Sequence, residues 1–155
     1  MRAYDGIKAE RGRRVSLETP DFLEHARRLL ASNIHLEIRM SGSSMQPAIV
    51  DGDVITIEPV SDTPIRPGDV VLYASRRDTA VIHRVIRIER SEAERLVITR
   101  GDAAFQNDPP IPLSKIMGRV QLVERGGEAV EIRRPKSKLA LALLGFIRRL
   151  RFRPK

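Results

Sequence analysis

The sequence contains no cysteine and no tryptophan, and aromatic residues make up only 4% of its 155 positions. Without cysteine, the chain has no disulfide, no thiolate nucleophile and no zinc site built on cysteine. Its three histidines, His25, His35 and His83, show no spacing typical of metal ligands, so neither a metal nor another cofactor is expected. The shortage of aromatic side chains also leaves little to stack on nucleic-acid bases.

Long apolar runs are absent as well. No stretch approaches the roughly 20 apolar residues that a helix needs to span a bilayer. No apolar segment follows the basic residues of the N-terminus, so the pattern of a signal peptide is missing. From the sequence we therefore expect a cytoplasmic or peripherally membrane-associated protein.

The net charge of +8 is unevenly distributed along the chain. Residues 133–155 contain nine basic residues and no acidic one, whereas residues 15–132 contain 14 basic and 18 acidic residues. A mildly acidic body with a basic tail suits an anionic membrane surface, or simply solubility, better than a nucleic-acid-binding face. We expect no nucleic-acid partner. The opposing hypothesis requires a salt-sensitive affinity that is lost on deleting residues 134–155.

The length suits one domain with one proper core. We predict a polar N-terminal segment at residues 1–18, a single domain at residues 19–133 and a basic amphipathic tail at residues 134–155. A helix is predicted to begin at Thr19-Pro20, with the hydroxyl as N-cap and proline in the first turn, and to end near Asn33.

After this helix the hydrophobic period changes to two, which is typical of half-buried strands. Strands are predicted at 34–40, 53–58, 69–74, 79–90, 95–99, 116–124 and 128–133, with a tight turn at Arg125-Gly126-Gly127 between the last two. The sequence therefore predicts a mainly β, antiparallel fold with one short N-terminal helix.

The tail carries an apolar stripe at Leu139, Leu143, Ile147 and Leu150 and a crowd of arginines at its far end. This pattern predicts a C-terminal amphipathic helix. Residues 138–153 are suited to lie in a membrane interface or to pack on the core, and the sequence favours neither.

The strongest chemical signal is the segment Ser41-Gly42-Ser43-Ser44-Met45-Gln46-Pro47. A serine hydroxyl near neutral pH needs a neighbouring base before it becomes a nucleophile. Gly42 allows the backbone to approach a substrate, and the amide of Ser44 is a candidate oxyanion donor. Met45 gives the loop an apolar edge.

His83 is the natural candidate for the base, because the ordinary pKa of histidine, about 6.5, lies near neutral pH. An imidazole base also needs an acceptor that fixes its tautomer. Two carboxylates follow in the nearby sequence, Asp102 after Gly101 and Asp108 before a Pro-Pro pair. The residues alone do not choose between them.

Several separate motifs in this order carry a resemblance to a known family. Ser-Met-x-Pro, Gly-Asp, Arg-Pro-Gly-Asp-Val-Val, His-Arg-Val and Arg-Gly-Asp with a following aspartate resemble the signal peptidase I superfamily over roughly residues 38–120. Histidine in the base position, in place of lysine, is similar to the branch found in archaea, the endoplasmic reticulum and some bacteria. The resemblance implies a signal peptidase/LexA-like antiparallel β assembly.

The same resemblance implies roles for single residues. Ser44 matches the nucleophile because it directly precedes Met45, although Ser43 stands beside it. His83 matches the general base, and Asp108 matches the carboxylate of the triad. Asp102 matches a second required aspartate, which is expected to have a structural role. Arg84 is expected to be a strand or salt-bridge residue.

The function implied is a serine endopeptidase that cleaves a peptide or precursor protein after small residues, with the substrate bound as an added strand. Members of the superfamily are usually tethered by transmembrane helices, and here an amphipathic helix takes that place. The alternative is a LexA-like self-cleaving module or a peptide-binding domain without turnover. LexA-type repressors use lysine as the base and carry a helix-turn-helix domain, for which residues 1–33 are too short.

Overall fold

The computed structural model describes residues 7–8, 14–15, 20–60, 64–130 and 132. These residues form strands of 2 to 11 residues, one α-helix and one 3-10 helix. In chain order the elements are β1 (Ile7–Lys8), β2 (Arg14–Val15), α1 (Pro20–Ala31), β3 (Leu36–Arg39), β4 (Val54–Pro59), β5 (Val70–Ala74), β6 (Ala80–Arg90), β7 (Arg95–Arg100), β8 (Ile111–Pro112), η1 (Leu113–Lys115), β9 (Ile116–Arg125) and β10 (Glu128–Val130).

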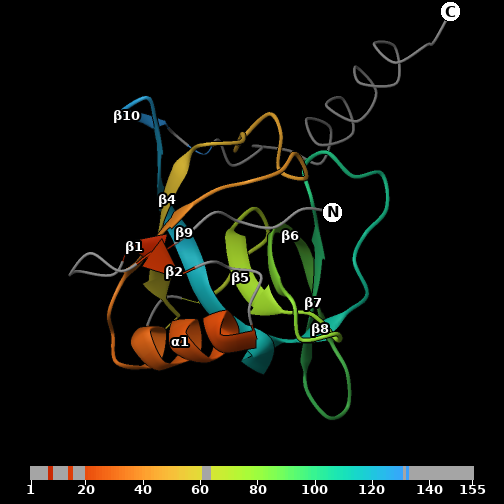
Figure 1. The fold of residues 1–155 in the computed structure, drawn as a ribbon. Coiled ribbons are helices and arrows are strands. Elements are labelled where there is room, and N and C mark those ends of the chain that lie inside the picture. The colour runs from red at the N-terminus through yellow and green to blue at the C-terminus, as the bar shows by residue number, and fades with distance from the viewer. Residues whose placement is uncertain (1–6, 9–13, 16–19, 61–63, 131, 133–155) are drawn as a thin grey trace, which may run out of the picture.

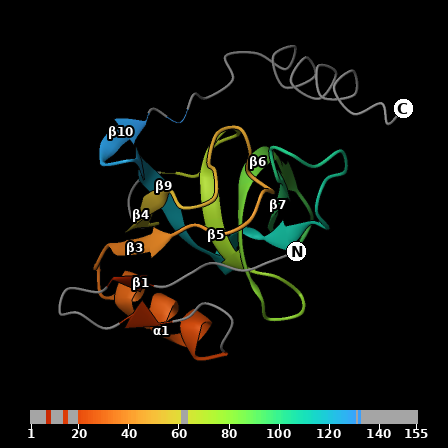
Figure 2. The ribbon, with the colours of Figure 1, turned by 45° about the horizontal axis from the view of Figure 1, so that its top comes forward.

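All strand pairs are antiparallel and belong to one sheet in the order β2-β1-β3-β4-β9-β5-β6-β7-β8, with β10 added to β9. The sheet curves strongly, and α1 lies at one end of it, against β3, β4 and β9 (Figures 1 and 2). The prediction of a mainly β, antiparallel fold with one short helix near the N-terminus is confirmed.

Apolar side chains form two clusters, one on each face of β5. Val70, Leu72 and Ala74 point into the cluster that also buries the helix, whereas Val71 and Tyr73 point into the other. Alternation along the strand therefore buries every residue of β5. Because β6 pairs with β5, His83 lies opposite Val71 in the register and faces the side of the second cluster.

The helix is followed by a residue in the left-handed conformation, Asn33, whose φ is 59°. The amide of Ile34 donates to the carbonyl of Leu29 and the amide of Asn33 to that of Leu30, which is the Schellman pattern. Ile34 therefore belongs to the helix cap and is 47% exposed. The prediction that the strand begins at Ile34 is wrong by two residues for this reason.

Two further differences concern short elements. β1 and β2 lie within the segment 1–18, for which no strand was predicted, and Ile7 pairs with both Val15 and Ile38. β8 and η1 were also not predicted. The predicted amphipathic helix and the membrane-facing segment 138–153 lie outside the described residues.

Among the described residues, no helix combines the length and the apolarity needed to cross a membrane.

Candidate active site

The loop that carries the predicted nucleophile connects β3 to β4 and is closed at its base by backbone hydrogen bonds. The amide of Met40 donates to the carbonyl of Asp53 at 2.7 Å, and the amide of Gly52 donates back to the carbonyl of Met40 at 2.8 Å. Inside the loop, the amide of Gly42 donates to Asp51 Oδ1 at 2.9 Å. Gly42 has a φ of 104°, a conformation that other residues rarely adopt.

Burial along this loop separates the two serines from the methionine that follows them. Met45 is only 2% exposed and belongs to the cluster that buries the helix, whereas Ser43 and Ser44 are exposed. The amide of Ile49 donates to the carbonyl of Met45, which adds a helical turn after the serines. Met45 thus anchors the loop in the core, whereas Ser44 stays exposed to solvent.

His83 lies on β6 and contacts one of the two candidate carboxylates. Its Nδ1 is 2.6 Å from Asp108 Oδ2, and the side chains are 16% and 25% exposed. Asp108 is fixed in this place by its own backbone, because its amide donates to the carbonyl of Thr99 on β7 at 2.8 Å. The imidazole and the carboxylate are therefore held by adjacent strands of the sheet.

Gly101 lies between the loop that carries Ser44 and the imidazole of His83. A Cβ atom built on Gly101 would be 2.7 Å from the carbonyl oxygen of Ser44 and 3.1 Å from His83 Nε2. The amide of Ala103 donates to the same Ser44 carbonyl at 2.8 Å. The structure thus brings the loop at Ser44 to the Nε2 side of His83, on the other side of the ring from Asp108.

Asp102 has a different partner. It accepts two hydrogen bonds from Arg84, at 2.8 Å from Nε and 2.6 Å from Nη2, and Arg84 also donates to the carbonyl of Gly68 at 2.8 Å. The side chain of Arg84 is only 2% exposed. The expectation that Arg84 forms a salt bridge is confirmed, and this ion pair links β6, the loop after β7 and the turn before β5.

Two hydroxyl groups that the sequence analysis missed complete the surroundings of Asp108. Thr99 Oγ1 donates to Asp108 Oδ2 at 2.8 Å, and the Tyr73 hydroxyl donates to the same oxygen at 3.2 Å. Burial acts to raise the pKa of Asp108, but the hydrogen bond and charge of His83, together with the two hydroxyls, lower the pKa below its ordinary value. The available signal was a hydroxyl-bearing residue within or directly after an apolar run, Tyr73 in β5 and Thr99 after Leu96-Val97-Ile98 in β7.

The loop that carries Ser44 is held by one more buried side chain, that of Asp53. Asp53 is 2% exposed and accepts two hydrogen bonds from Arg125, at 2.9 and 2.8 Å, and one from the amide of Val50 at 2.8 Å. Burial acts to raise the pKa of Asp53, but these three hydrogen bonds and the charge of Arg125 lower the pKa below its ordinary value. The carboxylate therefore ties the end of the loop to the end of β9.

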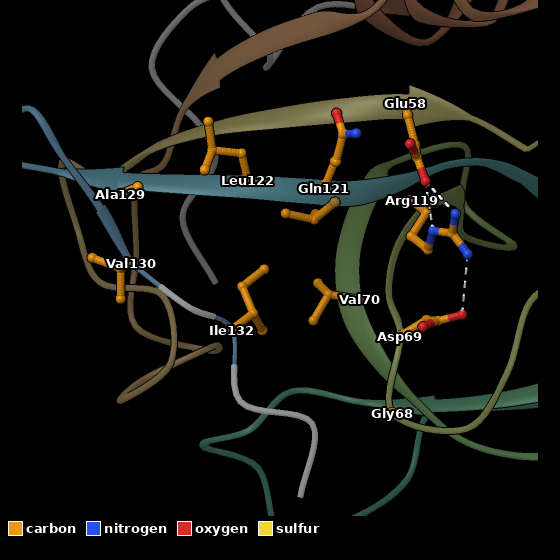
Figure 3. A pocket seen from close by; sticks show the side chains of 11 residues that line it. Glu58, Gly68, Asp69, Val70, Arg119, Gln121, Leu122, Ala129, Val130 and Ile132 are labelled. Atoms are coloured by element: carbon orange, nitrogen blue, oxygen red, sulfur yellow. Dashed lines mark hydrogen bonds and ion pairs between the residues drawn. The ribbon is translucent and has the colours of Figure 1, made fainter.

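A groove of about 620 Å³ lies elsewhere on the molecule, where β9 is bordered by the start of β5 on one side and by β10 on the other. Its walls combine apolar and polar side chains, and at one end Arg119 lies between Glu58 and Asp69 (Figure 3). None of the predicted site residues lines this groove. Within the described residues, no group of three or more histidine or acidic side chains is placed to hold a metal ion.

Comparison with known proteins agrees with this arrangement of motifs. Residues 6–120 match the family described as Peptidase S24-like. The chain is 34% identical over 113 residues to the signal peptidase complex catalytic subunit SEC11 of Yarrowia lipolytica, an alignment that covers 72% of this chain and 60% of that protein. It is 33% identical over 76 residues to the human signal peptidase complex catalytic subunit SEC11C, which covers 48% of this chain and 39% of that protein.

The chain thus spans less than two thirds of the length of these relatives. The matched family covers well over half of the chain, including the serine loop, the β6 histidine and both aspartates. The chain belongs to the peptidase S24-like family and is a member of the signal peptidase I-like superfamily.

Proposed function

We propose that this protein is a serine endopeptidase of the signal peptidase type in which Ser44, His83 and Asp108 act together. The observation that carries the proposal is the placement of His83, with Nδ1 on Asp108 and Nε2 facing the Ser44 loop across Gly101. A histidine held in this way is suited to take a proton from a hydroxyl at Nε2. Membership of a peptidase family supports the same reading.

In the first step, the Ser44 hydroxyl oxygen attacks the carbonyl carbon of the scissile peptide bond while its proton passes to His83 Nε2. The carbonyl oxygen becomes an oxyanion, which is stabilised by backbone amides of the loop that contains Gly42, Ser43 and Met45. The protonated imidazole then gives its proton to the amine that leaves. The product of this step is an ester between Ser44 and the N-terminal part of the substrate.

In the second step, water loses a proton to His83 and attacks the ester carbonyl, which releases the acid product and restores the serine hydroxyl. Asp108 holds the imidazole in the tautomer that leaves Nε2 free to accept and stabilises the imidazolium that forms. Asp102 acts indirectly, because it contacts Arg84 rather than the imidazole.

The substrate we propose is a peptide or precursor protein that binds as an added strand and is cleaved after a small residue. The printed names of the relatives, catalytic subunits of signal peptidase complexes, support a precursor protein as the substrate class. We further propose peripheral membrane association through the basic tail at residues 138–153. Sedimentation with anionic vesicles, with and without residues 134–155, tests the second proposal.

Cleavage of a peptide library tests the proposed activity. The wild-type protein should produce fragments whose new C-termini carry alanine or another small residue, as identified by mass spectrometry. The Ser44→Ala variant should produce none, whereas Ser43→Ala should retain the cleavage pattern. Equal cleavage by wild type and Ser44→Ala would contradict the proposal.

A further inference from the structure

Tyr73, His83 and Thr99 project from the same face of three neighbouring strands. In the register, Tyr73 of β5 pairs with Val81 of β6, and Thr99 of β7 pairs with Val85 of β6. Side chains on a strand alternate between faces, so Val81, His83 and Val85 share one face, and the paired residues share it with them. The two hydroxyls therefore flank the imidazole, one from each neighbouring strand.

Both hydroxyls reach the carboxylate oxygen that His83 contacts. Asp108 Oδ2 lies 2.6 Å from His83 Nδ1, 2.8 Å from Thr99 Oγ1 and 3.2 Å from the Tyr73 hydroxyl. Thr99 Oγ1 also lies within hydrogen-bond distance of the Tyr73 hydroxyl, at 3.0 Å. Three side chains from three strands thus converge on one oxygen of a side chain that comes from a loop.

The proton count favours an ionised Asp108 in either arrangement of the hydroxyls. Each hydroxyl has one proton to donate. Thr99 donates either directly to Asp108 or to Tyr73, and Tyr73 in turn donates to Asp108. In both cases the donated protons run toward the carboxylate, which accepts them best when it carries its negative charge.

Burial makes these hydrogen bonds stronger than surface contacts. Thr99 is fully buried and Tyr73 is 2% exposed, and both lie beside the apolar cluster that includes Val71 and Val85. A buried hydroxyl needs a hydrogen-bond partner. A hydrogen bond between Tyr73 and Thr99 would give each of them one, whatever their role in the site. This need for a partner does not explain why both hydroxyls also point at the Asp108 oxygen that contacts His83.

We propose that Tyr73 and Thr99 are positioning residues that hold the Asp108 carboxylate ionised and directed at His83 Nδ1, an inference that rests on the proposed function. Both side chains are buried. Their effect reaches the reaction through Asp108, which orients the imidazole.

Hydrogen bonds from both hydroxyls help to lower the pKa of Asp108. Removing either hydroxyl should therefore raise the pKa of Asp108, because burial then acts against the ionised form with less compensation. It should also loosen the carboxylate, so that kcat falls about tenfold, the effect expected of one hydrogen bond to a charged group. KM should stay nearly constant, because both side chains are buried and their hydroxyls point at Asp108.

The experiment uses the full chain with ¹³C-labelled aspartate and the variants Tyr73→Phe and Thr99→Val. The titration of the Asp108 carboxyl is followed by NMR, and kcat and KM are measured on a cleaved peptide. Thr99→Ser keeps the hydroxyl and should restore wild-type values. Thr56→Val on β4 makes the same chemical change in another part of the sheet and should alter neither quantity.

An Asp108 titration that stays at the wild-type pH, or an unchanged kcat, in folded Tyr73→Phe protein overturns this proposal. Circular dichroism establishes that each variant is folded, and Tyr73→Phe serves alone if Thr99→Val does not fold. The titration needs no turnover. A wild-type protein that cleaves nothing would therefore remove the proposed function, while the titration still decides whether the two hydroxyls hold the carboxylate.

Discussion

His83 Nδ1 lies 2.6 Å from Asp108 Oδ2, in a place where both side chains are largely shielded from water. Shielding makes an ionised carboxylate costly unless it is paired, and here the imidazole and two hydroxyls compensate for the lost hydration. The net result is a pKa of Asp108 below its ordinary value. This relationship has consequences for stability as well as for the proposed reaction.

Asp108→Asn should make the protein less sensitive to acid. A carboxyl whose pKa is lower in the folded state than in the unfolded chain stabilises the fold above its ordinary pKa of 3.8. That stabilisation is lost as the pH falls from 3.8 through the lower, folded value. The free energy of unfolding, measured by urea titration between pH 6 and pH 2, should therefore fall less steeply in the variant. Identical slopes would contradict the pairing of Asp108 with His83.

Gly101→Ala should lower peptidase activity by at least about tenfold and destabilise the fold by roughly 1–3 kcal/mol. The added Cβ would meet the Ser44 carbonyl at 2.7 Å and His83 Nε2 at 3.1 Å, so the loop and the imidazole would have to separate. Gly126→Ala is the control, because its Cβ meets nothing within 4 Å and only its φ of 61° is unfavourable. The control should lose stability and keep its kcat.

Breaking the buried ion pair between Arg84 and Asp102 should cost about 3–5 kcal/mol when one partner is removed, because a charge is then left unpaired. Arg84→Met and Asp102→Leu each remove one partner, and urea denaturation measures the loss. The double variant should recover much of the stability, since no unpaired charge remains. If the double variant loses as much free energy of unfolding as the two single variants added together, the two residues do not stabilise the fold as a pair.

Asp53→Ala should destabilise the protein by roughly 1–3 kcal/mol, because the amide of Val50 and the guanidinium of Arg125 lose a buried acceptor. Because Asp53 closes the serine loop, activity should fall as well. Removing the exposed pair of Arg87 and Glu89, whose side chains are about half exposed, should change stability by less than about 1 kcal/mol. Thermal unfolding compares the two, and equal losses would contradict the role given to Asp53.

The elements that follow a single rule could be predicted from the sequence. The pair Thr19-Pro20 predicted a helix, and the first residue of α1 is Pro20. Alternating apolar residues predicted the bounds of β4 and β6 to within a residue or two. The wrong or missed predictions lie where an apolar residue belongs to a neighbouring element, or where a strand is very short. Ile34 continues the alternation of β3 but belongs to the cap of α1, and β1 is too short to have a period.

The candidate site could be predicted only in part. The resemblance implied Ser44, His83 and Asp108, but the residues alone left open the choice between Asp102 and Asp108 as the partner of His83. That choice is made by the hydrogen bond from the Asp108 amide to the Thr99 carbonyl and by the pairing of Asp102 with Arg84. Contacts between residues far apart in the sequence produce no periodic pattern, so they could not be predicted from it.

The measurement that tests the central claim most directly is labelling with a fluorophosphonate, followed by identification of the modified residue by tandem mass spectrometry. The account predicts that the probe modifies Ser44 in the wild-type protein, that His83→Ala slows the labelling by several orders of magnitude and that Ser43→Ala leaves its rate unchanged. Modification of Ser43 in place of Ser44, or an equal labelling rate without the imidazole, would contradict it.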